Sequence, residues 1–319
     1  MSLVSYPRAK KPEAVTPDFG HFAVRIEECC VSLSALLLVI VAAITHACWN
    51  LLAKKAAAVG APFVAAYTGL ATILYAPLAL WAVLRFGFPM TRLVVACIVA
   101  SGMLHLAYSL VLQRGYQVAD LSVVYPVARG TGPMLSAVGA FALLGEHLTL
   151  GSVAGLVAVA GGIITLASGG RLAMLADRSA QTGVAWGAAT GTVIAGYTVV
   201  DGWGVKMLGL NPALLDWCAN LLRFVFLLPS VMQDTQRFRE RMRGHWLLAA
   251  SVGVLSPLGY ILVLTALQMG APLHVVAPAR EMSMMIGARL GMIVLGEKRT
   301  IARFSGCVLI VGGVVLLST

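Results

Sequence analysis

The sequence contains ten long apolar stretches separated by short polar gaps. They lie at 33–53, 62–84, 92–113, 118–144, 148–168, 182–206, 212–232, 245–268, 270–295 and 300–318. A helix needs about 20 mostly apolar residues to cross the hydrocarbon core of a bilayer. Gaps such as residues 145–147 allow only tight helical hairpins. We therefore predict an all-α polytopic membrane protein with ten transmembrane helices and no soluble domain.

The composition supports lipid as the main solvent. Of the 319 residues 59% are hydrophobic and only 11% are charged, whereas a water-soluble domain carries about 25% charged residues. The net charge of +10 does not predict a nucleic-acid partner, because the basic residues lie mostly in the gaps, where they face anionic head groups. The cysteines have no metal-ligand spacing, and we expect neither a metal nor a cofactor.

Residues 1–32 are predicted to form a poorly ordered N-terminal tail. They contain Pro7, Pro12 and Pro17 and the pair Lys10 and Lys11. They do not form a signal peptide, because the apolar run that follows starts late and has the length of a membrane span.

An internal repeat relates residues 115–166 to 266–317 at a constant offset of 151. The offset places Arg129 on Arg280, residues 145–146 (Gly-Glu) on 296–297, and residues 161–162 (Gly-Gly) on 312–313. We predict a first five-helix repeat at 33–168, a connecting loop at 169–181 and a second repeat at 182–319. Because five spans are an odd number, the second repeat enters the membrane in the opposite orientation, an arrangement common in secondary transporters.

Several motifs resemble those of one transporter family. They are residues 117–126 (QVADLSVVYP) with 143–146 (LLGE), their partners at 271–278 and 295–297 (LGE), and residues 46–50 (HACWN) at the end of the first span. With the repeat, they resemble the EamA branch of the drug/metabolite transporter superfamily. The resemblance implies export or exchange of small metabolites, often amino acids and related compounds, across a bacterial inner membrane.

The orientation in the membrane has two opposing indications. The resemblance implies that both termini are cytoplasmic. The positive-inside rule favours the reverse, because more Lys and Arg residues lie in the gaps on the other side, including Arg237, Arg239, Arg241 and Arg243.

Two arginines at membrane depth are the clearest candidates for substrate contact. Arg129 and Arg280 lie midway along the fourth and ninth spans, close to prolines such as Pro126 and Pro278. Proline frees backbone carbonyls and kinks a helix, and kinked segments at equivalent places in two repeats indicate a central site. The guanidinium groups either bind an anionic part of the substrate or tie helices together through the freed carbonyls.

Glu281 adds a carboxylate next to Arg280 that has no counterpart in the first repeat, where Gly130 stands. It has three interpretations: it accepts an ammonium group of a zwitterionic substrate, it takes up a proton during transport, or it pairs with Arg289 in a structural salt bridge.

Further candidates lie on corresponding helices of the two repeats. His46 and Asn50, with Trp49, share a face of the first span, and Tyr197 and Asp201 share a face of the sixth, followed by Trp203. Both clusters line one vestibule, or they are side chains that gather at a membrane interface without binding anything. Weaker candidates are Tyr108 with His105, and His274.

Other patterns predict structure. Asp216, Asn220 and Arg223 have the spacing of an intrahelical ion pair bridged by an amide. Gly145–Glu146 and Gly296–Glu297 are expected to serve turns at span ends. The glycines of the fifth and tenth spans predict close helix packing, within the chain or in a homodimer.

We therefore expect a multi-pass inner-membrane secondary transporter of small polar or amphipathic metabolites, such as organic anions or zwitterions, working by alternating access. A proton-coupled exporter of cationic compounds and a passive channel are the alternatives. An enzyme is not expected, because motifs such as HExxH and GxSxG are absent from the sequence.

Overall fold

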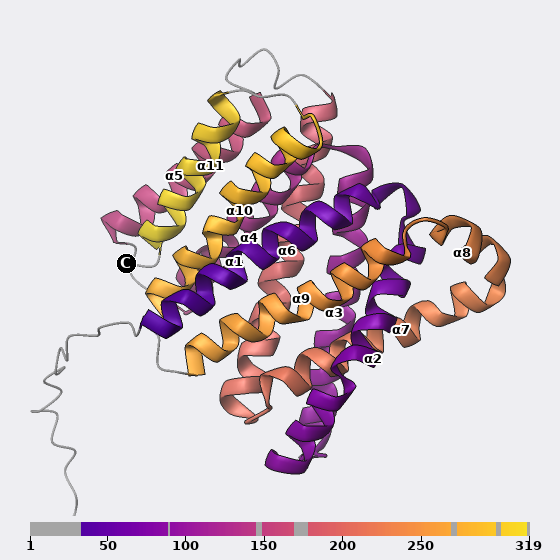
Figure 1. The fold of residues 1–319 in the computed structure, drawn as a ribbon. Coiled ribbons are helices and arrows are strands. Elements are labelled where there is room, and N and C mark those ends of the chain that lie inside the picture. The colour runs from indigo at the N-terminus through magenta and orange to yellow at the C-terminus, as the bar shows by residue number, and fades with distance from the viewer. Residues whose placement is uncertain are drawn as a thin grey trace, which may run out of the picture. The chain divides into compact units, whose positions relative to one another are not determined.

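The chain is helical throughout the part that the computed structural model describes, which is residues 33–88, 90–144, 149–168, 178–268, 273–297 and 301–317. The predicted all-α class is confirmed, and these ranges contain no strand. The expected N-terminal tail, 1–32, lies outside them. The elements are α1 (Leu33–Lys55), η1 (Ala57–Val59), α2 (Ala61–Phe86), α3 (Arg92–Val118), α4 (Leu121–Leu144), α5 (Leu150–Ser168), α6 (Arg178–Met207), α7 (Pro212–Gln233), α8 (Thr235–Met242), α9 (Trp246–Gln268), α10 (Leu273–Val294) and α11 (Ile301–Leu317) (Figure 1).

Two helical segments differ from the expected boundaries. α6 begins at Arg178, so the last residues of the expected loop at 169–181 are helical, because Ser179, Ala180 and Gln181 tolerate a helix without being strongly apolar. The gap after the seventh span contains the short helix α8, which Asp234 caps by accepting a hydrogen bond from the Arg237 backbone N–H at 2.8 Å. Hydropathy alone detects neither segment, because both are polar.

Six described helices have the length and apolarity of a membrane span. They comprise residues 37–55, 61–86, 92–118, 180–205, 212–233 and 246–263, and shorter apolar helical segments lie at 150–165, 283–294 and 304–316. Large apolar side chains cover the outer surface: Leu84, Leu247 and Ile301 are 78%, 80% and 90% exposed. A surface of this kind is suited to lipid, and the chain is a multi-pass membrane protein.

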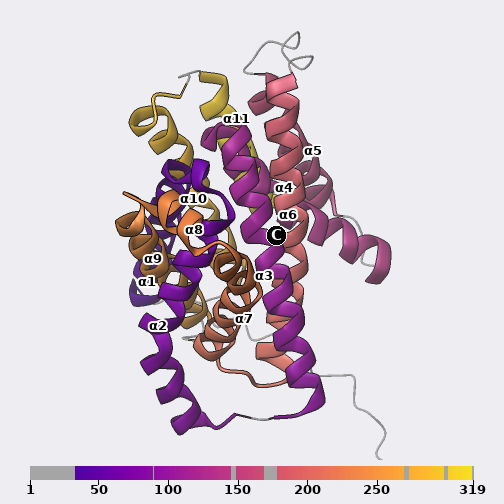
Figure 2. The same cartoon turned by 90° about the vertical axis from the view of Figure 1, so that its right-hand side faces the viewer.

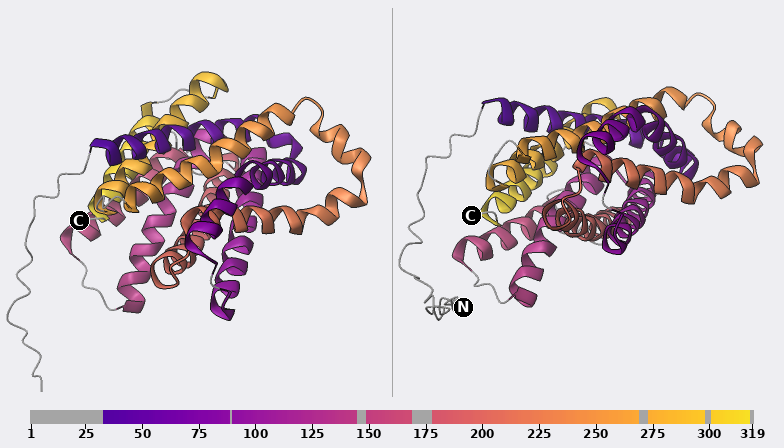
Figure 3. Two further views of the ribbon diagram at one scale, coloured as in Figure 1. Left: turned by 60° about the horizontal axis from the view of Figure 1, so that its bottom comes forward. Right: turned by 90° about the horizontal axis from the view of Figure 1, so that it is seen from below.

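Helices distant in the sequence pack in pairs. α1 packs against α9 and α10, and α6 packs against α3 and α4. α2 packs against α7, α4 against α10, and α5 against α11, which run side by side (Figures 1 and 2). The short helix α8 joins α7 to α9 at the edge of the bundle, away from α5 and α11 (Figure 3). The largest buried side chains include Phe63, Tyr116 and Tyr125, so the bundle centre is rich in aromatic residues.

Candidate functional site

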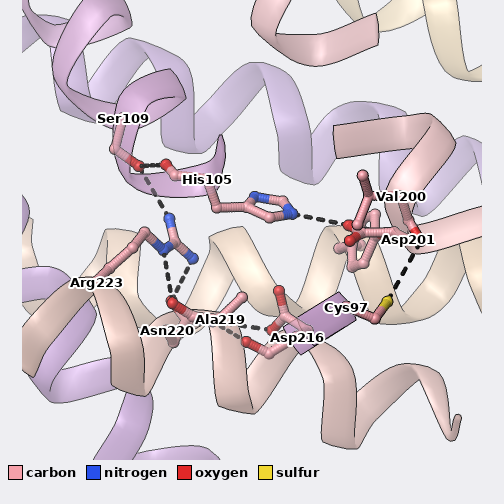
Figure 4. Close-up of polar contacts among 10 residues, drawn as sticks. Cys97, His105, Ser109, Val200, Asp201, Asp216, Ala219, Asn220 and Arg223 are labelled. Atoms are coloured by element: carbon pink, nitrogen blue, oxygen red, sulfur yellow. Dashed lines mark hydrogen bonds and ion pairs between the residues drawn. The ribbon is translucent and has the colours of Figure 1, made fainter. Parts of the chain in front are cut away.

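A buried histidine and a buried aspartate meet between α3 and α6. His105 Nε2 lies 2.8 Å from Asp201 Oδ2, and the two side chains are 9% and 4% exposed. Tyr260, on α9, donates a second hydrogen bond to the same carboxylate oxygen at 3.0 Å. Three helices of low polarity thus each contribute one polar group to a single contact (Figure 4 shows His105 and Asp201). Ionisable residues inside membrane spans generally mark functional sites.

Aromatic rings surround this contact. The Tyr197 ring stacks on His105, with a centroid distance of 4.2 Å and an interplanar angle of 22°. Tyr108 meets Tyr197 edge to face at 5.5 Å. Tyr197 and Asp201 therefore share a face of α6, and this face meets His105 and Tyr108 of α3. Trp203 is 41% exposed and belongs to the outer surface.

A second polar chain runs along α7 and reaches α3. Asn220 donates to Asp216 Oδ2 at 3.0 Å and accepts from Arg223 Nη2 at 2.6 Å, so the predicted amide-bridged pair is confirmed. Arg223 Nη1 also donates to Ser109 Oγ at 3.0 Å, and that hydroxyl donates to the His105 carbonyl at 2.8 Å (Figure 4). The α7 charges are thereby connected to the helix turn that carries His105.

Two buried oxygens beside the histidine–aspartate contact form no hydrogen bond of standard geometry. They are Asp201 Oδ1 and Ser101 Oγ, which belong to two interacting residues that are each at most 3% exposed as a whole. Ser101 precedes His105 by one turn of α3. Because buried polar atoms are normally paired, this side of the Asp201 carboxylate is a candidate position for a ligand or a proton.

The predicted cluster on α1 forms a separate set of contacts. Trp49 Nε1 donates to His46 Nδ1 at 3.0 Å, and the Asn50 side chain donates to the His46 carbonyl at 2.7 Å. The Tyr116 hydroxyl donates to Asn50 Oδ1 at 2.6 Å. The His46 ring packs against Gly259 of α9, where an added Cβ would lie 3.3 Å from it. All three predicted residues are buried and face neighbouring helices.

Arg129 is buried at the predicted depth of α4. It is 5% exposed, and its guanidinium carbon lies 5.6 Å from the centroid of the Tyr125 ring, a cation–π distance. The Tyr125 hydroxyl donates to Ser283 Oγ of α10 at 3.0 Å. Arg129 therefore stands next to the contact between α4 and α10, the two helices that carry the repeated arginines.

For several other predicted residues the structure gives the helix that carries them but not the side chain. Arg280, Glu281 and His274 lie in α10, and their side chains are outside the described structure, as is Glu146. Glu297 accepts hydrogen bonds from the backbone N–H groups of Leu121 and Ser122 at 2.7 and 3.0 Å. It therefore caps the N-terminus of α4, the kind of structural role expected for the Gly-Glu pairs.

Ser101, Ser109 and Tyr260 were missed by reasoning from the sequence. The internal repeat could have identified two of these residues. Its offset of 151 also places His46 on Tyr197, Asn50 on Asp201 and Ser109 on Tyr260. Extending the repeat to the earlier helices identifies Tyr260 as the counterpart of a polar residue. Ser101 has no such signal, because isolated serines are common in membrane helices.

The fold and this interior define a multi-pass helical membrane protein with ionisable groups buried between its helices. No group of three or more metal-ligating side chains occurs in the described part of the chain. The model of the EamA-like transporter family, which is part of the drug/metabolite transporter superfamily, matches residues 181–319, so the second half of the chain is similar to this family. The predicted resemblance is confirmed for this half, and the similarity suggests a membrane transporter.

A solved crystal structure of another protein has a similar fold. It matches 89% of this chain and 97% of its own length with a TM-score of 0.57 and 16% sequence identity. No curated protein matches the sequence.

Proposed function

We propose that the protein is a secondary transporter in which ten membrane-spanning helices form two inverted five-helix repeats. It moves small polar or amphipathic metabolites, such as amino-acid-like zwitterions or organic anions, across the inner membrane by alternating access. The direction is export or exchange, as the family resemblance implies.

The symmetry of the helix contacts supports the inverted repeat. In the proposed repeat, α1, α2, α3, α4 and α5 correspond in this order to α6, α7, α9, α10 and α11. Exchanging the two halves then converts the α1–α9 contact into an α6–α3 contact and the α1–α10 contact into an α6–α4 contact, and all four contacts occur. The contacts α2–α7, α4–α10 and α5–α11 are unchanged by the exchange, and they occur as well. Two halves related in this way can exchange conformations, which is the basis of alternating access.

The single observation that carries the proposal is the buried polar cluster between the halves. His105 comes from the first half, and Asp201 and Tyr260 come from the second. Burying such groups in a membrane is costly unless they serve a pathway or a partner. A carboxylate at Asp201 and a guanidinium at Arg129 offer opposite charges to a zwitterion, with Arg280 and Glu281 as sequence-based additions.

The test is uptake by the purified protein in liposomes. We expect saturable uptake of at least one radiolabelled probe from a panel of amino acids, phosphonates and guanidinium compounds. Arg129→Lys keeps the charge but loses the planar fork, and we expect it to reduce uptake about tenfold or more if the arginine binds the substrate. Thr192→Ala, on an exposed position of α6, is the matched control.

Normal uptake by Arg129→Lys would assign the arginine to helix packing. Arg280→Ala provides the second measurement, and we expect loss of uptake with near-normal folded yield. Uptake of no probe, or flux that never saturates, would contradict the carrier.

One observation favours an exporter of cationic compounds as a second candidate. The first span contains no carboxylate between residues 33 and 53, but α6, its counterpart, holds the buried Asp201. Preferred uptake of the guanidinium probes, abolished by Asp201→Asn, would support this alternative.

A further inference from the structure

We propose that His105 and Asp201 form a proton-binding site whose occupancy is coupled to the movement of the two halves. This inference rests on the proposed transport function and names its coupling ion. It assigns the buried contact between α3 and α6 a role beyond holding the helices together.

The geometry brings an acid and a base into one hydrogen bond. The 2.8 Å separation between His105 Nε2 and Asp201 Oδ2 allows a proton to be held by either group, and both side chains are nearly inaccessible. Histidine is the side chain whose ordinary ionisation falls nearest to neutral pH. Histidine and carboxylate groups at membrane depth are the usual components of proton pathways in transporters.

The second carboxylate oxygen has a weaker contact. His105 and Tyr260 both contact Oδ2, whereas Oδ1 accepts no hydrogen bond of standard geometry and the Ser101 hydroxyl is a further group that interacts with this carboxylate. A proton on Oδ1 would turn that oxygen into a donor toward a neighbouring acceptor. Uptake and release of the proton make and break only an O–H or N–H bond, so no other reactant is required.

The helices packed around the contact carry further ionisable groups. They are His46 of α1, Tyr75 of α2, Cys97 and Tyr108 of α3, Arg129 of α4, Tyr197 of α6, Asp216 and Arg223 of α7, and Tyr260 of α9. Asp216 and Arg223 balance each other through Asn220. Arg129 lies against Tyr125, and His105 is the basic side chain that directly contacts Asp201.

The location of the contact supplies the coupling. His105 belongs to one half and Asp201 to the other, so movement of the halves changes the distance between the two groups. A proton is then held differently in the two access states, and by linkage its binding shifts the equilibrium between those states.

Infrared difference spectra of the purified full-length protein test the site without any substrate. A change from about pH 8 to about pH 5, which spans histidine ionisation, is expected to produce imidazole and carboxyl bands. Asp201→Asn should remove the carboxyl band and displace the imidazole band, and His105→Gln should do the converse. His245→Gln, at the start of α9 and outside the cluster, is the control and should keep the bands of the pair.

If the contact is purely structural, the pH change should produce no infrared band that both Asp201→Asn and His105→Gln alter. That result would overturn the proposal. If Asp201→Asn does not fold, Tyr260→Phe serves as the second variant. It removes one donor to the carboxylate while leaving the pair, and it is expected to displace the carboxyl band. Unchanged bands in a folded Tyr260→Phe variant would also count against the site.

Proton movement in liposomes tests the coupling. With a pH-sensitive dye inside and a mixture of amino acids outside, we expect proton entry to accompany amino-acid uptake and to fall to the protein-free rate in Asp201→Asn. Uptake without proton movement would overturn the coupling while leaving the transport function intact. Normal infrared bands without uptake would support the proton site and count against amino-acid transport.

Discussion

Asn220 is the residue on which two buried charges depend. Its amide joins Asp216 to Arg223 within α7, and all three side chains are at most 7% exposed. A buried charge without a hydrogen-bond partner is strongly destabilising. The contribution of this residue to folding should therefore be large, even if it never contacts a substrate.

Replacing Asn220 with Leu is expected to lower the free energy of unfolding by about 2–4 kcal/mol, because two charged groups each lose a hydrogen bond. Thermal unfolding in detergent measures the loss. Thr192→Ala removes only an exposed intrahelical hydrogen bond and should change stability by less than about 0.5 kcal/mol. Equal melting temperatures for the two variants would mean that water or lipid already satisfies the α7 charges.

At the scale of helices, the contact between α5 and α11 depends on one glycine of each repeated pair. A Cβ added at Gly162 would lie 2.7 Å from the Gly306 carbonyl oxygen, and one at Gly313 would lie 2.7 Å from the Gly155 carbonyl oxygen. At Gly161 and Gly312 a Cβ would meet nothing within 4 Å. The close packing predicted for these glycines therefore occurs within the chain, and the outward-facing glycines are the ones available to a second copy.

Alanine substitutions separate these two roles. Gly162→Ala and Gly313→Ala should each destabilise the protein by about 1–3 kcal/mol through overpacking. Gly161→Ala and Gly312→Ala should be neutral or slightly stabilising, because alanine favours a helix over glycine by up to about 1 kcal/mol. Thermal unfolding of the four variants measures these differences in stability. If Gly161→Ala and Gly312→Ala alone shift the protein to a monomer, the unsubstituted protein is a homodimer.

For the molecule as a whole, alternating access requires the two halves to separate at one end. Ala119, at the end of α3, and Gly183, near the start of α6, come from opposite halves, and an added Cβ at Gly183 would lie 3.1 Å from that of Ala119. Disulfides join Cβ atoms about 3.8 Å apart, so a small adjustment allows a bond.

A double variant, Ala119→Cys with Gly183→Cys and with the native cysteines replaced, should lose uptake when oxidised and regain it on reduction. Each single cysteine variant should respond to neither treatment. Uninterrupted uptake by the cross-linked protein would rule out a mechanism in which this end opens.

The orientation of the molecule is also a whole-molecule property. α8 carries the exposed Arg237, Arg239 and Arg241, and it lies at the end where Lys54 contacts the backbone of Tyr116. The C-terminal half of α7, which leads into α8, packs against the first half of α2, as the contact between Phe224 and Gly69 indicates. Basic residues concentrated at one end favour a cytoplasmic location for that end.

We therefore expect a single cysteine at Gln236 to be protected from an impermeant maleimide in intact cells and labelled in inverted vesicles. A single cysteine at Gly87, in the turn between α2 and α3, should behave in the opposite way. The reverse pattern would support cytoplasmic termini, the orientation that the family resemblance implies.

The helical class follows from the amino-acid sequence alone, because long apolar stretches with few charges are stable only as helices in lipid. The sequence also located most helix boundaries and the candidate residues Arg129, Tyr197 and Asp201, since a polar side chain inside an apolar stretch is conspicuous. The contacts of Asp201 with His105 and Tyr260, and the packing of His46 against Gly259, follow only from the tertiary structure. The physical reason is that helical periodicity assigns a residue to a face, whereas the partner of that face depends on packing between helices more than fifty residues apart.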